Sequence, residues 1–232
     1  MVVNKITNFD IFEKVNFPQL KELNLKNYNI SEIEILEKFK FEKLISLILN
    51  HNKISNIKIL RNLNYKELKE LDLSYNSISD IKILAKVNFQ KLEILNLSNN
   101  KISNIDILEN ENFKNLKKLN LNNNNNKISN ISILEKVNFE NLETLSLVKN
   151  EISNIEVFES VNFRNLKELN LSKNKIKDIK IFKKVKFEKF QMLNLGYNEI
   201  TDINVLDYMQ IKKLNKLILR ANEISDISVY QK

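Results

Sequence analysis

Hydrophobic residues recur along this chain with a period of about 24 residues. Each unit contains the pattern L-x-x-L-x-L-x-x-N, and its alternation of apolar and polar positions predicts a half-buried β-strand. In the clearest unit, Leu95 and Leu97 flank the polar Asn96. All intervals between units are equal except the one after Leu116, which is longer by two. The nine units begin at Leu20, Leu44, Leu68, Leu92, Leu116, Leu142, Leu166, Phe190 and Leu214.

The second half of each unit follows the pattern I-S-x-I-x-I-L-x-x-V-x-F. Its hydrophobic residues, such as Ile133, Leu134 and Val137, recur at roughly helical spacing, so we expect a short helix or 3-10 turn with its apolar edge inward. A Ser followed by Asp or Asn, as at Ser79 and Asp80, predicts a cap for this helix.

An Asn follows the predicted strand in every unit but the first, where Tyr28 takes its place. An amide has both donors and an acceptor, so a buried column of Asn can satisfy backbone groups where the chain turns. The chain has only one Gly and one Pro, so we also expect Asn, which tolerates the left-handed region, to make the turns. The predicted structural column consists of Asn52, Asn76, Asn100, Asn124, Asn150, Asn174, Asn198 and Asn222.

A single unit cannot bury its hydrophobic face, so the units must stack and share one core. We therefore expect a right-handed α/β solenoid with a concave parallel β-sheet and short helices or 3-10 turns on the convex side. Residues 1–232 form one predicted domain, in which residues 1–19 are a partial repeat and residues 20–232 are nine repeats, the last truncated. Neither end shows a dedicated capping segment, which fits either a fragment of a longer array or ends covered by another chain.

The fifth unit is irregular. Its polyasparagine run, residues 122–126, carries the two-residue insertion, and Glu111 occupies a slot that holds Val in most units. An insertion in a repeat maps to a loop, often on a functional face. Replication slippage also produces such runs, and we favour that interpretation.

The repeat resembles the leucine-rich-repeat family from about Leu20 to Asn222. Its I-S-x-I-x-x-L segment is similar to that of bacterial internalins and of a protein phosphatase regulatory subunit, although those repeats are typically about 22 residues long. The resemblance implies a horseshoe whose concave sheet binds a protein partner, without identifying that partner.

The net charge of +8 raises the alternative of a nucleic-acid-binding surface. The only arginines are Arg61, Arg164 and Arg220, however, and guanidinium is the usual group for bidentate phosphate and base contacts. A composition heavy in Lys, Asn and Ile fits an A/T-rich coding bias better than selection for phosphate binding. Nucleic-acid binding is therefore the weakest of the functions that we consider.

Composition also bears on cellular location. The chain has no Cys, Met1 to Asp10 lack the features of a signal peptide, and no run of 18 apolar residues occurs. These features predict a cytoplasmic protein without a membrane span, and they leave a secreted fragment open.

Catalytic groups are scarce. Without Cys and with His51 as the only His, thiol–imidazole and zinc sites are excluded. A triad of His51, Asp72 and Ser74 is formally possible, but no oxyanion hole accompanies it. We therefore expect no enzyme activity, no cofactor and no bound metal.

The side chains at the third, fifth and seventh positions of the strand should face the concave side, with the eighth at the sheet's edge. Most are small and polar, so larger residues stand out as partner-binding candidates, because aromatic, Met and Arg residues often anchor interfaces. We expect one cluster around Tyr75 and a stronger one around Tyr197. The candidates are Ile48, His51, Tyr75, Ile94, Val148, Met192, Tyr197, Ile218 and Arg220.

The sequence thus predicts a protein–protein interaction module with an unidentified protein partner. The main alternative is a structural, self-associating element, because uncapped ends expose strands that invite edge pairing.

Overall fold

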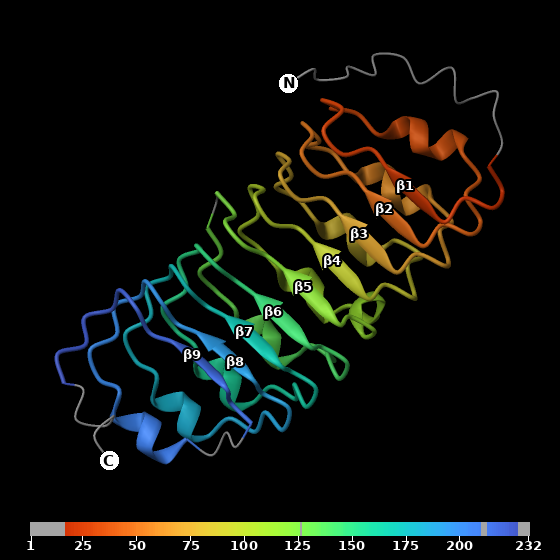
Figure 1. Cartoon of the computed structure of the whole chain (residues 1–232). Coiled ribbons are helices and arrows are strands. Elements are labelled where there is room, and N and C mark those ends of the chain that lie inside the picture. The colour runs from red at the N-terminus through yellow and green to blue at the C-terminus, as the bar shows by residue number, and fades with distance from the viewer. Residues whose placement is uncertain (1–16, 126, 210–212, 227–232) are drawn as a thin grey trace.

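Within the described part of the chain, nine parallel strands form one open sheet and pair in sequence order from β1 to β9 (Figure 1). The computed structural model describes residues 17–125, 127–209 and 213–226. Equivalent residues of consecutive repeats face each other, as Leu71 and Leu95 do, which confirms the predicted solenoid. The strands are β1 (Glu22–Asn24), β2 (Ser46–Ile48), β3 (Glu70–Asp72), β4 (Ile94–Asn96), β5 (Lys118–Asn120), β6 (Thr144–Ser146), β7 (Glu168–Asn170), β8 (Met192–Asn194) and β9 (Lys216–Ile218).

The other side of the array consists of short 3-10 helices (Figure 1). The predicted cap is confirmed for the Asp or Asn of the Ser–Asp or Ser–Asn pair. The residue that precedes each repeat's main helix is Ile, and from η2 onward an Asp or Asn one position earlier accepts the bond, as Asp80 Oδ1 does from the Lys82 N–H at 2.9 Å. The helices are η1 (Glu34–Lys38), η2 (Lys58–Asn62), η3 (Lys82–Ala85), η4 (Asp106–Glu109), η5 (Glu111–Phe113), η6 (Ser132–Glu135), η7 (Glu156–Glu159), η8 (Lys180–Lys183) and η9 (Asn204–Tyr208).

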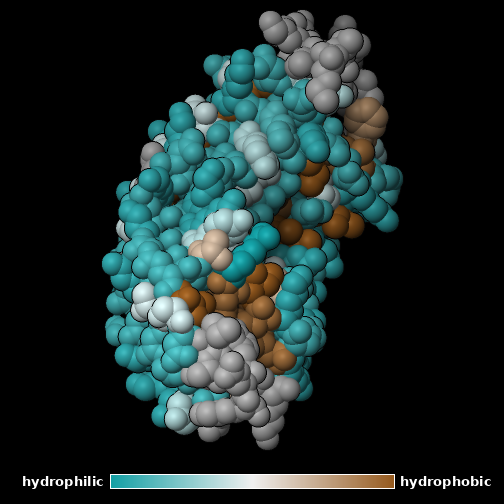
Figure 2. Space-filling model, turned by 60° about the vertical axis from the view of Figure 1, so that its left-hand side comes forward, coloured by the Kyte–Doolittle hydropathy of each residue, from teal (hydrophilic) through white to brown (hydrophobic). Residues whose placement is uncertain are grey.

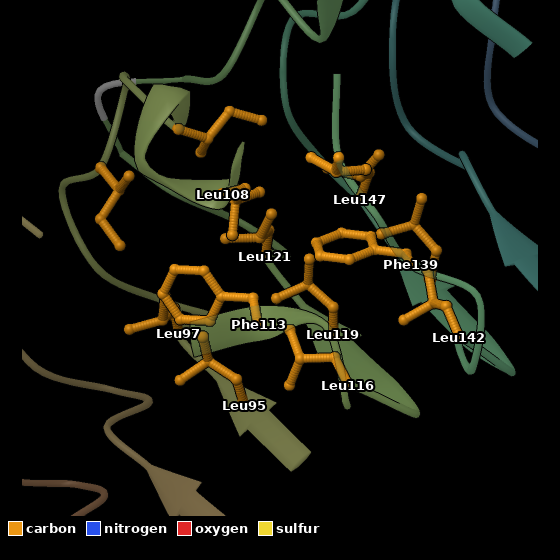
Figure 3. Close-up of a cluster of buried hydrophobic side chains, with 14 of the residues drawn as sticks. Leu95, Leu97, Leu108, Phe113, Leu116, Leu119, Leu121, Phe139, Leu142 and Leu147 are labelled. Atoms are coloured by element: carbon orange, nitrogen blue, oxygen red, sulfur yellow. The ribbon is translucent and has the colours of Figure 1, made fainter. Parts of the chain in front are cut away.

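The core is continuous along the array. Phe113 from η5 points into the same interior as Leu119 from β5 and Phe139, which both belong to the next repeat (Figure 3). Phe139 in turn stacks on Phe163, with 6.0 Å between the ring centroids. Each repeat therefore buries its hydrophobic face against its neighbours rather than within itself.

Tyr65 takes a place that Phe holds in most repeats. Its hydroxyl donates to the Leu36 carbonyl oxygen at 3.2 Å, so the polar end of this buried side chain has a partner. Burial raises the pKa of the Tyr65 hydroxyl, because the phenolate would lose its hydration.

The ninth-position amides bind backbone groups of two consecutive repeats. Asn100 Oδ1 accepts from the Ile78 N–H at 3.0 Å, and its Nδ2 donates to the carbonyl oxygens of Leu73 and Leu97 at 3.0 and 3.1 Å. The same three kinds of bond recur from Asn52 to Asn222. We call this column the Asn ladder. It links each repeat to the one before it at the end of every strand.

The eighth residue of every unit is left-handed, with φ between 50° and 63°. The expectation that Asn makes these turns is only partly correct, because His, Tyr, Lys and Ala also occupy them. The backbone is held from the next repeat, as the Tyr75 N–H donates to the Ser98 carbonyl oxygen at 2.9 Å. We call these residues the eighth-position row: Asn27, His51, Tyr75, Asn99, Asn123, Lys149, Lys173, Tyr197 and Ala221.

The insertion of the fifth unit leaves the sheet unchanged. Leu119 and Leu145 remain opposite each other, although the interval between them in sequence is longer than that between Leu95 and Leu119. The extra residues form a loop in which the Lys127 N–H donates to the Asn124 carbonyl oxygen at 2.8 Å, while Asn126 lies outside the described residues. The loop follows the strand, so it does not disturb the strand register.

The C-terminal end of the array is less well buried than its middle. Leu214, Leu217 and Leu219 are only half-buried, whereas the equivalent residues of the inner repeats are fully buried. Hydrophobic surface gathers at this end in Figure 2. The partial repeat that we predicted for residues 1–19 lies outside the described residues up to residue 16.

Candidate recognition surface on the concave sheet

The candidate residues divide into two groups by exposure. Ile48, Ile94, Val148, Met192 and Ile218 are half-buried on the inner face of the sheet. His51, Tyr75, Tyr197 and Arg220 are exposed at the edge where the strands end. Tyr75 and Tyr197 retain 48% and 44% exposure, which is high for side chains of this size. The edge therefore carries the more exposed of the candidate side chains.

The first cluster is a ring stack. His51 and Tyr75 occupy the same row in adjacent repeats, and their rings lie 4.0 Å apart with 10° between the planes. Ser74 donates its hydroxyl to Asp72 Oδ1 at 2.6 Å. These three polar residues therefore do not form the triad arrangement, since the Ser hydroxyl bonds to the carboxylate and the His ring stacks on Tyr75.

The second cluster joins an aromatic ring to two cations. The Lys173 Nζ lies 5.3 Å from the Tyr197 ring centroid, and the Arg220 Cζ lies 5.2 Å from the same centroid. Both distances fall within the range of cation–π attraction. Lys173 was not among the residues predicted from the sequence. It occupies the same repeat position as Tyr197, one repeat earlier, and this position could have indicated it.

Other candidates do not join these clusters directly. The register places Met192 opposite Lys216, and Ile218 opposite Asn194. Ile94 has Glu70 and Lys118 as its strand neighbours, so it lies in neither cluster.

Alternating charges form a ladder at the second position, which the sequence reasoning also missed. Glu93 accepts from Lys69 at 3.1 Å and from Lys117 at 2.8 Å, and Glu143 pairs with Lys167 at 2.8 Å. Hydrogen bonds from Lys117 and Lys69 lower the pKa of Glu93, and the Lys167 bond lowers that of Glu143. The regular recurrence of Lys and Glu at the same position of successive repeats was the available signal. These lysines are neutralised within the protein.

These Lys–Glu pairs predict that the stability of the protein depends slightly on pH in the acid range. Glu93→Gln should lower the free energy of unfolding by at most about 0.5 kcal/mol near neutral pH, because the pair is solvent-screened. The pKa of Glu93 is depressed in the folded state, so its contribution is complete above the unfolded-state pKa and is lost as pH falls through the folded one. The difference between variant and wild type in urea midpoints should therefore shrink towards low pH. Glu168→Gln is the matched control, and an equal effect there would contradict the assignment.

The convex side carries an open hollow of about 750 Å³ beside η7 and η8. Charged groups line it, but they pair with one another: the Lys184 Nζ lies 3.0 Å from Glu159 Oε1. Among the residues that the structure describes, no group of three or more His, Asp or Glu side chains is placed to hold a metal ion. The hollow therefore offers less for recognition than the concave edge.

Comparison with known proteins agrees with the repeat geometry. The family model described as leucine-rich repeats (2 copies) matches residues 66–110, 90–136 and 140–184. The chain belongs to the leucine-rich-repeat family. Among solved structures, this leucine-rich-repeat protein is similar to the internalin inlF of Listeria monocytogenes, with 28% identity and a TM-score of 0.76 over 97% of this chain and 67% of that one.

Two further structures show the same likeness. Internalin C2 of Listeria monocytogenes has 26% identity and a TM-score of 0.70, covering 86% of this chain and 80% of its own. A leucine-rich-repeat protein of Leptospira interrogans has 25% identity and a TM-score of 0.74, covering 92% of this chain and 58% of its own. No curated protein matches the sequence. The likeness to internalins that the repeat suggested is thus confirmed.

The leucine-rich-repeat fold is a general protein–protein interaction module, and domains like these typically have no catalytic activity. Within the described part of the leucine-rich-repeat chain, no helix has the length and apolarity needed to cross a bilayer.

Proposed function

We propose that the chain binds a protein partner through its concave sheet and the adjoining eighth-position row. The observation that carries this proposal is the pair of exposed, ordered aromatic clusters around Tyr75 and Tyr197 on one edge of the sheet. Exposed Tyr and Arg residues that are already held in place lose little conformational freedom on binding, which favours them as anchors.

Site-specific photo-crosslinking tests the choice of face. A crosslinking residue at Asn194, which lies in β8 on the inner face, should capture the partner from a cell extract. The same residue placed at Lys183, which lies on the convex side in η8, is the control. Capture of the same proteins from both positions would contradict recognition by the concave face.

Alanine substitution then tests the anchors. Tyr197→Ala and Arg220→Ala should each weaken the captured partner's binding by about 1 kcal/mol or more, measured by calorimetric titration. The two effects should not add, because Arg220 and Tyr197 contact each other. Unchanged affinity in both variants would remove the C-terminal cluster from the proposed site.

The self-association alternative has weaker support. A repeat stacked onto the C-terminal end would have to offer a ninth-position Asn to the Ile224 N–H, as every inner repeat does for its predecessor. The first unit of a second copy carries Tyr28 at this place instead. Head-to-tail stacking of two copies would therefore lack one bond of the Asn ladder. The one-domain organisation of residues 1–232 and the cytoplasmic location remain predictions.

A further inference from the structure

We propose that the C-terminal part of the eighth-position row binds an acidic segment of the protein partner. This inference deepens the proposed function and rests on it, because it names the chemistry that the partner must present. The site consists of Lys149, Lys173 and Tyr197, together with Arg220 from the following repeat. We call these four residues the cationic row.

The repeat geometry places these side chains in a line. Lys149, Lys173 and Tyr197 have φ values of 56°, 57° and 57°. Their N–H groups donate to the carbonyl oxygens of the next repeats at 2.9, 2.9 and 2.8 Å. Consecutive members are therefore held at the spacing of neighbouring parallel strands, about 4.8 Å. With Arg220, the row presents three positive charges close together on the surface.

Two cations contact the ring of Tyr197. Lys173 and Arg220 each lie over the ring of Tyr197 at about 5 Å from its centroid. A cation–π contact fixes the direction of a long side chain but leaves its N–H groups free to donate to an oxygen acceptor. The cationic row therefore retains its hydrogen-bonding capacity.

No carboxylate neutralises the cationic row within the described residues. Elsewhere on the sheet's edges, lysines pair with glutamates, as Lys117 does with Glu93 and Lys175 with Glu151. Lys149, by contrast, has no acidic group within ion-pair distance among the described residues, and the same holds for Lys173 and Arg220. The row is thus a positive surface that no described carboxylate neutralises, and what distinguishes it is the contact of two of its cations with one exposed ring.

The single glycine of the chain supports the position of Arg220. A Cβ added to Gly196 would lie 3.4 Å from Arg220 Cγ and 3.3 Å from the Arg220 carbonyl oxygen, so any side chain here would press on Arg220. The φ of Gly196 is not positive, so its backbone does not require glycine. The preceding repeat has Ser172 at the equivalent place, where its hydroxyl bonds to Asn170 at 2.8 Å. Gly196 is therefore a positioning residue for Arg220.

The charge pattern favours a short acidic peptide over a nucleic acid. Lys149 and Lys173 follow β6 and β7, whose other ends carry Glu143, which pairs with Lys167, and Glu168, so the positive surface is short. A nucleic acid has a charge at every phosphate and would meet these carboxylates along the strand direction. An extended acidic segment needs only two or three carboxylates opposite the row.

Fluorescence anisotropy with defined probes tests the inference. The probes are a short fluorescein-labelled peptide of alternating Asp and Glu, its Asn and Gln counterpart, and a labelled single-stranded oligonucleotide of similar length. Wild type should bind the acidic peptide at least about tenfold more tightly than the amide peptide, with affinity that falls as salt rises. It should also bind the acidic peptide more tightly than the oligonucleotide.

Paired substitutions locate the binding. The double variant Lys173→Gln, Arg220→Gln should bind the acidic peptide about tenfold more weakly. The matched control is Lys180→Gln, Lys183→Gln on the convex side, where Lys183 lies 5.0 Å from the Tyr208 ring centroid, and it should bind like wild type. Gly196→Ser should weaken binding severalfold by moving Arg220, whereas Ser172→Gly should not. Circular dichroism confirms that each variant is folded.

The outcomes separate the two proposals. Equal affinity for the acidic and amide peptides, tighter binding of the oligonucleotide, or equal loss in the convex control would overturn the acidic-segment inference. If crosslinking from Asn194 persists in the Lys173→Gln, Arg220→Gln variant with undiminished yield, concave recognition stands and the cationic row does not contribute. If the peptide test succeeds but the partner crosslinks equally from Lys183, the proposed face is wrong.

Discussion

Replacing Asn100 with alanine is expected to lower the free energy of unfolding by about 3–5 kcal/mol. The Asn100 side chain is 1% exposed, and its amide satisfies the Ile78 N–H and the carbonyl oxygens of Leu73 and Leu97. Alanine would leave these buried groups without partners, and each unsatisfied group costs about 1–3 kcal/mol. Urea unfolding followed by far-UV circular dichroism measures the change.

Two other asparagines serve as controls for that prediction. Asn104→Ala removes an exposed bond to the Asp106 N–H at 2.9 Å and should cost about 1 kcal/mol or less. Asn222→Ala should fall between the two, because Asn222 is half-buried in the last repeat. An Asn100→Ala variant no less stable than Asn104→Ala would show that the Asn ladder does not stabilise the stack.

Leu119→Ala should be similarly damaging, with a cost of about 2–5 kcal/mol. Leu119 is 1% exposed in β5 and lies among the leucines and phenylalanines of three consecutive repeats (Figure 3). Truncation to alanine removes its apolar contacts and leaves a cavity that a close-packed interior cannot fully close. The shift in the urea midpoint, converted with the measured dependence on urea concentration, gives the cost.

The equivalent leucine of the last repeat is the matched comparison. Leu217 occupies the same slot in β9 but is only half-buried, so Leu217→Ala should cost less than about 2 kcal/mol. A solenoid's stability is a sum over repeats and the interfaces between them, and Leu217 is packed less completely than Leu119. Equal costs for Leu119→Ala and Leu217→Ala would contradict this account of the C-terminal end.

The period of the sequence was sufficient to predict the fold. Leucines at the fourth and sixth positions can be buried together only if each repeat lies beside the next, so the spacing between Leu71 and Leu95 determines both the strands and their register. The insertion after Asn124 did not disturb the prediction, because it falls in a loop outside the strand.

Side-chain neighbours were harder to predict than strands. His51 and Tyr75 occupy equivalent positions of consecutive repeats, so the repeat spacing places them side by side and accounts for their stacking. The contacts of Lys173 and Arg220 with Tyr197 depend on side-chain directions at a left-handed turn, which the sequence pattern does not specify. The turns themselves were attributed to Asn, because residue preferences do not show the hydrogen bonds that most of these residues donate to the next repeat.

The side chain at the left-handed turn after each strand can be substituted without disturbing the fold. Main-chain bonds from the following repeat fix that residue's backbone, as they do for Lys149 and Tyr197, and its side chain extends into solvent. Very different side chains already occupy the nine sites without altering the register. Each site is therefore an interchangeable display position, and a library randomised there alone should yield altered specificities from an unaltered scaffold.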